Sequence, residues 1–578
     1  MFGLALAVPL TVLQLLLLFS QTVVHAAPAP ATPNVPIKQA LQCVVGSFTS
    51  VATLPGVTVT IEKAVSVSDR GSYGDATDQG FPQTIDLLPA LCAVTVKVTD
   101  TSDTPGKPAS SYRFGMFLPA SAKWNNKMLT VGSASFAGGI NWPDMGQGPH
   151  YGFATISTDN GHNSNGSDLS WATPARLYDW GYRALHGSVV VGKLLVAHYY
   201  GRPLTYSYYS GCSTGGRQGL REIQYDASSF DGALIGSPAW DTVDLMPWIS
   251  KMAVYQLNTT DGQLGVQQLS ILAAEVLRQC DAQDGLADNV ISAPEQCSFN
   301  ISTIICSDPT TCLTAAQAQT AQKIWGDYTV DGKLVSNGFE LGSEDQWGVY
   351  FGDTSTLQGF DFDYERYFIY NTTGYVWQQY ADQAVADSRM VNPGLATANH
   401  FDISPYQTKA GIGGKGGKIM LYHGLSDGLI SPKSSLLYYQ QTMAAMGITN
   451  MDDMRSWFRF FEVPGMQHCW FSNRYNAPWD FASSGQATQL RLLPYLGVGL
   501  PAVGDGWSVP GHLNDSNYDA LAALQQWVED DKPVDQVIAT AFNSDFSANR
   551  TRPICPYPQK ATYNGSGDVN NASSWGCA

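Results

Sequence analysis

Charged residues are scarce in this sequence, and basic residues are scarcer than acidic ones. Of its 578 residues only 14% are Asp, Glu, Lys or Arg, and 32 basic residues against 49 acidic ones give a formal net charge of −17. Nucleic acids and anionic membrane surfaces are therefore disfavoured as partners, because both repel an acidic protein. The charge does not exclude a neutral small molecule, and nothing in the sequence indicates an oligomeric state.

Two motifs for zinc binding, H-E-x-x-H and C-x-x-C, are absent. Beyond the first 26 residues no apolar run reaches the ~20 residues of a membrane-spanning helix. We therefore expect neither a zinc enzyme of these types nor a membrane partner. The apolar fraction of 44% is nevertheless high enough for a real core and argues against a disordered chain.

The N-terminus is typical of an exported protein. Residues 1–26 indicate a signal peptide, because Phe2 to Phe19 is almost wholly apolar and Val24-His-Ala26 fits a cleavage site. This segment contains no Lys or Arg, so an uncleaved signal anchor is the alternative. Residues 27–39 are rich in Ala and Pro and predict a disordered leader.

Cysteines and glycosylation sequons also indicate export. The ten cysteines are an even number, which is normal in an oxidising compartment. Eight Asn-x-Ser/Thr sequons suggest a glycoprotein. They begin at Asn165, Asn258, Asn300, Asn371, Asn514, Asn549, Asn564 and Asn571. We therefore expect a secreted, extracellular protein.

A glycine-rich turn contains the candidate nucleophile, Ser213. Residues 206–210 can form a strand, residues 217–224 predict the start of a helix, and the segment 211–215 between them fits G-x-S-x-G. This context lifts the serine clear of a sheet and places the Thr214 amide at a helix N-terminus, where it can bind a developing oxyanion. A purely structural turn is the alternative.

A serine nucleophile needs a base and an orienting acid, and in α/β-hydrolases the chain order is Ser, then Asp or Glu, then His. The apolar strand predicted at 418–422 leads into Asp427, and a second strand, predicted at 457–463, leads into His468. Of the nine histidines only His468 and His512 follow Asp427, and His512 lies in a loop with no strand before it. His423 precedes the acid, and we interpret it as a strand-end residue that holds the loop of the acid.

Two cysteines flank these candidates, since Cys212 precedes Ser213 and Cys469 follows His468. If the serine and the histidine are within hydrogen-bond reach, the two sulfur atoms come within bonding distance. A disulfide here would hold the nucleophile and the base in register. Two unrelated core cysteines are the alternative.

Together these features resemble the fungal tannase and feruloyl esterase family, in which a disulfide links the nucleophile loop to the base loop. The segment Gly211-Cys-Ser-Thr-Gly-Gly-Arg-Gln-Gly219 is similar to the nucleophile motif of that family. Further similar stretches are 158–162, 171–172, 179–186, 230–240 and 552–577. The resemblance covers nearly the whole mature chain.

The resemblance implies an α/β fold, with an α/β-hydrolase core at 40–240 and 402–578. A large lid domain, 241–401, would be inserted between the nucleophile and the acid, which agrees with a chain longer than one compact core usually needs. Ser213, Asp427 and His468 would form the catalytic triad. The implied disulfides are Cys212–Cys469, Cys43–Cys92, Cys280–Cys297, Cys306–Cys312 and Cys555–Cys577.

One loop departs from the family pattern. The family has a loop similar to Gly-Asn-Gly-Gly-Phe-Ala-Gly, where this chain has Gly132-Ser-Ala-Ser-Phe-Ala-Gly138. Such a loop normally supplies the second oxyanion amide, which we expect within Gly132–Phe136. Because Ala134 and Ser135 replace glycines, the donor survives only if its backbone angles are accessible to a residue with a side chain.

The predicted lid contains an acidic segment, Cys280-Asp-Ala-Gln-Asp-Gly-Leu-Ala-Asp-Asn-Val290. Three carboxylates at this spacing around a glycine can converge on a hard cation together with backbone carbonyls, and a solvated acidic turn is the alternative. The resemblance implies a structural Ca²⁺. Its ligands would be the side chains of Asp281, Asp284 and Asp288 and the backbone of Leu286 and Val290.

The lid is also rich in aromatic residues, as in Phe360–Phe368. These could face a planar phenolic ring or form the core of the lid itself. By resemblance we expect a serine carboxylic ester hydrolase of plant phenolic esters, with feruloyl or other hydroxycinnamoyl esters first, either small or attached to cell-wall polysaccharide. The alternatives are a tannase that cleaves galloyl esters and, from another class, a catalytically inactive calcium-binding glycoprotein.

Overall fold

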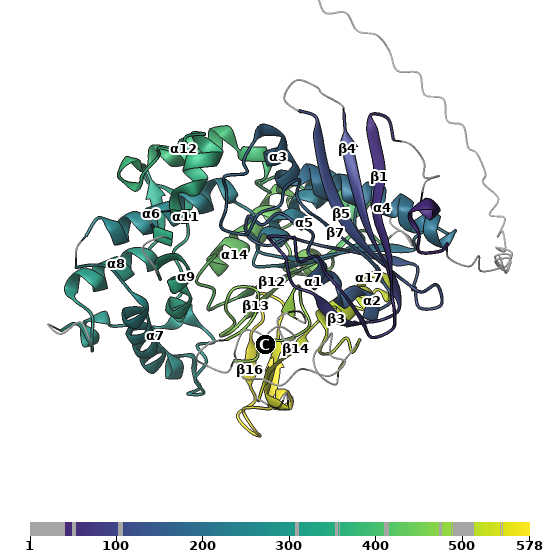
Figure 1. The fold of residues 1–578 in the computed structure, drawn as a ribbon. Coiled ribbons are helices and arrows are strands. Elements are labelled where there is room, and N and C mark those ends of the chain that lie inside the picture. The colour runs from purple at the N-terminus through teal and green to yellow at the C-terminus, as the bar shows by residue number, and fades with distance from the viewer. Residues whose placement is uncertain are drawn as a thin grey trace, which may run out of the picture. The chain divides into compact units, whose positions relative to one another are not determined.

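Nine strands form one mixed sheet in the computed structural model of the chain (Figure 1). The pairs from β1 to β7 are antiparallel, and the pairs from β7 onward are parallel. Their order across the sheet is β1 (Val57–Val67), β4 (Leu91–Asp100), β5 (Ser110–Pro119), β7 (Ala154–Thr158), β6 (Lys127–Val131), β8 (Tyr206–Cys212), β9 (Gly232–Gly236), β12 (Lys418–Gly424) and β13 (Phe458–Val463).

The structure describes most of the chain after residue 40. The described residues are 41–48, 54–101, 108–259, 261–306, 311–352, 356–357, 359–409, 415–472, 477–486, 488, 512, 514–543, 545 and 547–578. The predicted signal peptide, 1–26, and leader, 27–39, lie outside them. Contacts join Gln39–Ala578 into one unit, which is described below.

The central strands are apolar on both faces because helices cover both. In β8, Tyr208 and Tyr209 are fully buried in the hydrophobic clusters on opposite faces, as the two-residue period of a strand requires. Met420 and Leu421 alternate in the same way in β12. The strands predicted at 206–210, 418–422 and 457–463 are β8, β12 and β13, and the predicted α/β-hydrolase architecture is confirmed.

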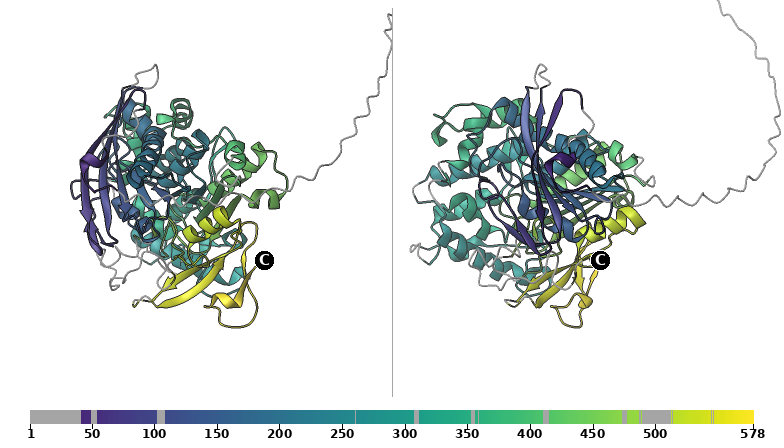
Figure 2. Two further views of the ribbon diagram at one scale, coloured as in Figure 1. Left: turned by 90° about the vertical axis from the view of Figure 1, so that its right-hand side faces the viewer. Right: turned by 45° about the vertical axis from the view of Figure 1, so that its right-hand side comes forward.

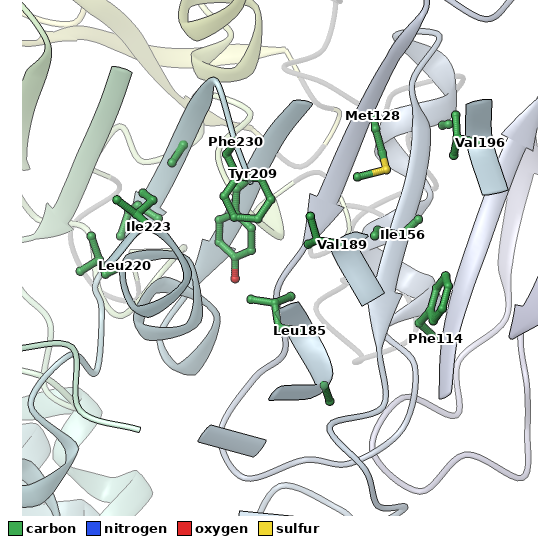
Figure 3. Close-up of a cluster of buried hydrophobic side chains, with 14 of the residues drawn as sticks. Phe114, Met128, Ile156, Leu185, Val189, Val196, Tyr209, Leu220, Ile223 and Phe230 are labelled. Carbon is green, nitrogen blue, oxygen red and sulfur yellow. The ribbon is translucent and has the colours of Figure 1, made fainter. Parts of the chain in front are cut away.

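Helices α4 (Ala184–Tyr200), α5 (Thr214–Tyr225) and α14 (Pro432–Ala445) pack on one face of the sheet, and α17 (Ala520–Asp530) packs on the other. Figure 3 shows Leu185 of α4 and Leu220 of α5 beside Tyr209 of the sheet. This packing holds the first turn of α5 at the end of β8, which is where Ser213 lies.

The chain between β9 and β12 forms a mostly helical insert, whose helices gather at one side of the sheet (Figures 1 and 2). The insert buries its own hydrophobic cluster, which includes Trp248 and Trp347 and takes in Phe136 and Trp180 from outside the insert. The main elements of the insert are α6 (Thr242–Leu257), α7 (Val266–Cys280), η3 (Asp281–Asp284), α8 (Ala315–Trp325), β10 (Tyr328–Val330), β11 (Lys333–Ser336), η6 (Glu344–Trp347), α9 (Gly348–Phe351), α11 (Phe360–Asp363), η7 (Tyr364–Ile369), α12 (Gln383–Val391) and α13 (Ser404–Thr408). The boundaries 241 and 401 stay a prediction.

The remaining strands and α-helices of the described chain are short or lie near its ends. They are β2 (Gly71–Tyr73), β3 (Ile85–Leu88), α1 (Trp142–Met145), α2 (Gln147–His150), α3 (Pro174–Tyr178), α15 (Met451–Arg455), β14 (Val537–Phe542), β15 (Ala548–Ile554), β16 (Ala561–Tyr563) and β17 (Trp575–Cys577). Within the described residues, no helix is both long enough and apolar enough to cross a bilayer.

All ten cysteines are paired. The five disulfides are Cys43–Cys92, Cys212–Cys469, Cys280–Cys297, Cys306–Cys312 and Cys555–Cys577, which are the pairs that the resemblance implies. Four of them join residues fewer than 50 positions apart, whereas Cys212 and Cys469 are 257 positions apart.

Candidate active site

Ser213 lies in the sharp turn between β8 and α5. Its backbone angles are φ 62° and ψ −124°, a strained conformation for a residue with a side chain. The Ser213 amide donates to the Gly236 carbonyl at 3.0 Å, and the Ser213 carbonyl accepts from the Arg217 amide at 3.0 Å. Neighbouring backbone therefore holds the turn on both sides of the serine.

Close backbone contacts explain the glycines of this turn. A Cβ atom on Gly211 would lie 2.7 Å from the carbonyl carbon of Gly215, and one on Gly132 would lie 2.6 Å from the Gly215 Cα atom. Both distances are too short for real side chains. The glycine-rich loop that begins at Gly132 thus passes directly against the first turn of α5.

Asp427 and His468 are paired through a short hydrogen bond. The Nδ1 atom of His468 lies 2.7 Å from Oδ2 of Asp427, and the amides of Leu429 and Ile430 each donate to Oδ1 at 2.9 Å. The Asp427 side chain is completely buried. Each residue follows the strand that the sequence analysis placed before it, β12 for the acid and β13 for the histidine.

His423 is the second histidine on the acid. Its Nε2 atom lies 2.9 Å from Oδ2 of Asp427, and its Nδ1 atom lies 2.7 Å from the Ser435 hydroxyl. Burial opposes ionisation of Asp427, but the charge of His468 and the hydrogen bonds from both histidines together lower the pKa of the carboxyl below its ordinary value. Asp427 is therefore ionised over the working pH range. His423 contacts the acid directly, which agrees with its interpretation as a residue that holds the loop of the acid.

A glutamine of the insert links the acid loop to the base loop. The Oε1 atom of Gln346 accepts from the Gly428 amide at 2.9 Å and from the His468 amide at 3.1 Å. Gln346 belongs to η6 and has no motif around it, so the sequence analysis did not identify it.

The Cys212–Cys469 disulfide joins the chain neighbours of Ser213 and His468, with the two Cα atoms 5.9 Å apart. Ser213 and His468 line the same cavity, whose volume is about 620 Å³. His512 lies elsewhere, stacked on Tyr518 with ring centroids 3.7 Å apart. The structure thus brings together the three residues predicted as a triad.

The cavity has two chemically different sides. The insert side packs in the hydrophobic cluster of the insert and consists of Phe136, Trp180, Leu245, Met246, Ile249, Tyr350, Phe360 and Leu429. The core side consists of Asp144, Trp470, Ser484 and Gly485. The chain neighbours of Asp144 belong instead to the hydrophobic cluster on the face of the sheet that α17 covers, and Trp470 packs against that cluster.

The loop with the substituted glycines also lines the cavity. The Gly132, Ser133 and Phe136 amides donate to Ser210, Gln218 and Gly166 respectively. Within the described part of the chain, the Ala134 and Ser135 amides have no protein acceptor.

Ser135 adopts a φ of 47°, in the left-handed region that favours glycine, and its hydroxyl donates to the Gly166 carbonyl at 2.7 Å. The loop therefore keeps a conformation suited to glycine although the glycine is absent.

The acidic segment of the insert folds back on itself. Oδ1 of Asp281 accepts from the Asp288 and Val290 amides at 3.1 and 3.2 Å, and Oδ2 of Asp288 pairs with Arg552 at 2.5 Å. Among the residues that the structure describes, no three His, Cys, Asp or Glu side chains are arranged as a metal site. The oxygen donors suit calcium chemically, but the side chains as they lie do not enclose a cation.

The chain is similar in sequence to known proteins. The family model described as "Tannase and feruloyl esterase" matches residues 92–578. The probable feruloyl esterase B-2 of Aspergillus fumigatus is 32% identical over 467 residues, which cover 79% of this chain and 82% of that protein.

Solved structures are similar as well. The crystal structure of feruloyl esterase B from Aspergillus oryzae is 26% identical, with a TM-score of 0.78 over 92% of this chain and all of that one. The tannin acyl hydrolase of Aspergillus niger, 21% identical, has the same fold with a TM-score of 0.68 over 93% of this chain and 95% of that one.

Proposed function

Because the chain belongs to the tannase and feruloyl esterase family of carboxylic ester hydrolases, we propose that it cleaves feruloyl and related hydroxycinnamoyl esters at Ser213. One observation carries this proposal. Ser213 lines the same cavity as His468, which is paired with Asp427, and one side of that cavity is apolar and aromatic. A planar hydroxycinnamoyl group suits such a wall, because it buries its ring and its propenoyl chain there.

In the proposed reaction His468 takes the Ser213 hydroxyl proton while Oγ bonds to the ester carbonyl carbon. The bond from that carbon to the alcohol oxygen then breaks, and His468 returns the proton to the leaving alcohol. Water attacks the acyl-enzyme by the same two proton transfers and releases the acid. Asp427 stays ionised throughout, and its bond to Nδ1 orients the ring and stabilises the imidazolium.

The proposed oxyanion donors are backbone amides. Thr214 opens α5 and lines the cavity, which supports its amide as the first donor. For the second donor we select Ala134 from the range Gly132–Phe136, because its amide has no acceptor in the described chain and its φ, unlike that of Ser135, is not positive. The glycine at this position of the family loop is then not needed for donation.

A galloyl group is the alternative acyl group, and the cavity favours it less. Its three ring hydroxyls each need a hydrogen-bond partner when buried, whereas the insert side of the cavity consists mostly of carbon. We therefore expect a higher kcat/KM on methyl ferulate than on methyl gallate.

A side-by-side turnover assay on the two methyl esters tests the function. Hydrolysis of methyl ferulate that is lost in Ser213→Ala supports the proposal, and faster hydrolysis of methyl gallate would favour a tannase. If neither ester nor a generic aryl ester is cleaved, the protein is an inactive glycoprotein and the proposal fails.

We also propose that the protein is a secreted glycoprotein that meets its substrate on plant cell-wall polysaccharide. Its five disulfides suit an oxidising compartment, and the Asn side chain of each of the eight sequons is exposed. Treatment with an endoglycosidase should lower the mass of protein secreted by a eukaryotic host.

A structural Ca²⁺ at Asp281, Asp284 and Asp288, with Leu286 and Val290 as backbone ligands, is a further proposal from the resemblance. The donors are hard oxygens on one folded segment of the insert. We expect millimolar CaCl₂ to raise the Tm of chelator-treated protein and Asp284→Asn to abolish the rise. Equal Tm values with calcium and with chelator, together with no calcium in metal analysis of the purified protein, would remove this site.

A further inference from the structure

The core side of the cavity contains a carboxyl group that the proposed reaction does not use. Asp144 lies in α1 and lines the cavity together with Ser484, Gly485 and Trp470. In the described chain no Lys, Arg or His is within ion-pair distance of it. A carboxyl group without a cationic partner, at the wall of a substrate cavity, calls for a functional explanation.

The contacts of Asp144 place it between the loop 132–138, which contains the proposed second oxyanion donor, and the base loop around His468. Nδ2 of Asn141 donates both to Oδ2 of Asp144 and to the Gly132 carbonyl, each at 2.9 Å. On the other side, a Cβ atom on Gly485 would lie 3.5 Å from Oδ2 of Asp144, so that glycine passes close to the carboxyl.

The Gly485 segment in turn contacts the base loop. Nε2 of the next residue, Gln486, donates to the Cys469 carbonyl at 3.3 Å and to the Trp479 carbonyl at 2.9 Å. Asp144 is therefore linked to the base loop through the Gly485 segment, and all three line the cavity.

The chemistry assigns this side to the leaving alcohol. His468 must protonate the alcohol oxygen as the ester bond breaks, so the alcohol lies towards the base loop when the acyl group occupies the insert side. The described hydrogen-bond partners of Asp144, Asn141 and Thr488, are both uncharged, and burial raises the pKa of its carboxyl. Such a group is suited to hydroxyl donors, and the half-buried indole of Trp470 adds an apolar surface beside it.

We propose that Asp144 determines specificity for the alcohol part of the ester by hydrogen bonding to hydroxyl groups of a sugar. The inference rests on the proposed function and adds to it the recognition of the leaving group. A methyl ester has no hydroxyl on its alcohol side and cannot use this contact, whereas a pentose ester of the same acid can.

The test compares two substrates with one acyl group, methyl ferulate and a ferulic ester of a pentose. In the full-length enzyme, Asp144→Ala should lower the ratio of kcat/KM for the pentose ester to kcat/KM for the methyl ester at least tenfold, mainly through KM for the pentose ester. Both values come from one protein sample, so partial unfolding cancels in the ratio. Asp144→Asn, which keeps the shape, should give a smaller fall of at least threefold.

Asp452→Ala is the matched control, because Asp452 is an exposed carboxylate on α15 outside the cavity, and its ratio should equal that of the wild type. An unchanged ratio in both Asp144 variants would show that the residue only positions Asn141 and would overturn the inference. If the wild type cleaves neither ester, the proposed function itself has failed, which is a different result.

Discussion

The Cys212–Cys469 bridge is covalently one residue away from both Ser213 and His468. It closes a loop of 257 positions and so reduces the entropy of the unfolded chain. In the chain-entropy model this stabilises the folded protein by on the order of 5 kcal/mol. Its position gives it a second effect, because it limits the separation of the nucleophile turn and the base loop. Small displacements of reacting groups have large effects on rate.

We expect the double variant Cys212→Ser/Cys469→Ser to lose at least tenfold in kcat on methyl ferulate, with a smaller change in KM. The control is Cys555→Ser/Cys577→Ser, which opens a bridge distant in sequence from both loops and should affect Tm more than kcat. Full kcat in the Cys212→Ser/Cys469→Ser protein at a temperature where it is folded would contradict a geometric role for the bridge.

At the residue scale, chain order together with three recognisable strand patterns predicts Ser213, Asp427 and His468 as the triad. The conformation of Ser135 was not predictable. Its φ of 47° is accompanied by the hydrogen bond from its hydroxyl to the carbonyl of Gly166, about 30 residues away, which no local pattern reveals.

At the scale of elements, η6 of the insert is in contact with the catalytic loops of the core. Through Gln346 it holds the Gly428 and His468 amides on one oxygen. The insert is therefore part of the framework of the site as well as a wall of the cavity. The sequence predicted β8, β12 and β13 from their patterns, but a single glutamine that accepts two amides from distant loops has no periodicity or motif by which to recognise it.

Replacement of Gln346 by Ala should lower kcat by about tenfold to a hundredfold, because two backbone amides lose their acceptor and the acid and base loops can shift. Gln346→Glu keeps an acceptor oxygen and should recover part of the loss. Gln383→Ala, an exposed glutamine on α12 of the same insert, should leave kcat unchanged. Equal kcat in Gln346→Ala and wild type would show that the loops hold their positions without the insert.

At the scale of the whole molecule, several buried carboxyl groups couple stability to pH. Burial raises the pKa of Asp159, Glu344 and Asp480 to about 7 and that of Glu365 to about 8. In the unfolded chain these groups ionise near their ordinary values of 3.8 and 4.5. Between about pH 4 and pH 8 the folded protein thus holds protons that the unfolded chain releases, and stability falls as pH rises.

The Tm at pH 8 should therefore be lower than at pH 5, by about 5 °C. The neutral buried His162, whose pKa burial lowers to about 4, acts in the opposite direction below about pH 6.5, but it acts against the four carboxyls above and Glu462, whose pKa burial also raises to about 7. Glu365→Gln imitates the protonated side chain and should reduce the difference between the two pH values. Differential scanning calorimetry at pH 5, 6.5 and 8 measures the change in Tm. An equal or higher Tm at pH 8 would contradict the raised pKa values of these buried carboxyls.

The spacing of the cysteines also has a consequence for the order in which the chain matures. Four of the five bridges join residues between 6 and 49 positions apart and can close as soon as their own segment has left the ribosome. Cys212 must wait for Cys469, 257 positions later, while the four cysteines of the insert emerge between them. The Cys212 thiol therefore stays unpaired for the longest time and can form disulfides with other cysteines. A host with a disulfide isomerase should yield a larger fraction of active enzyme than one without.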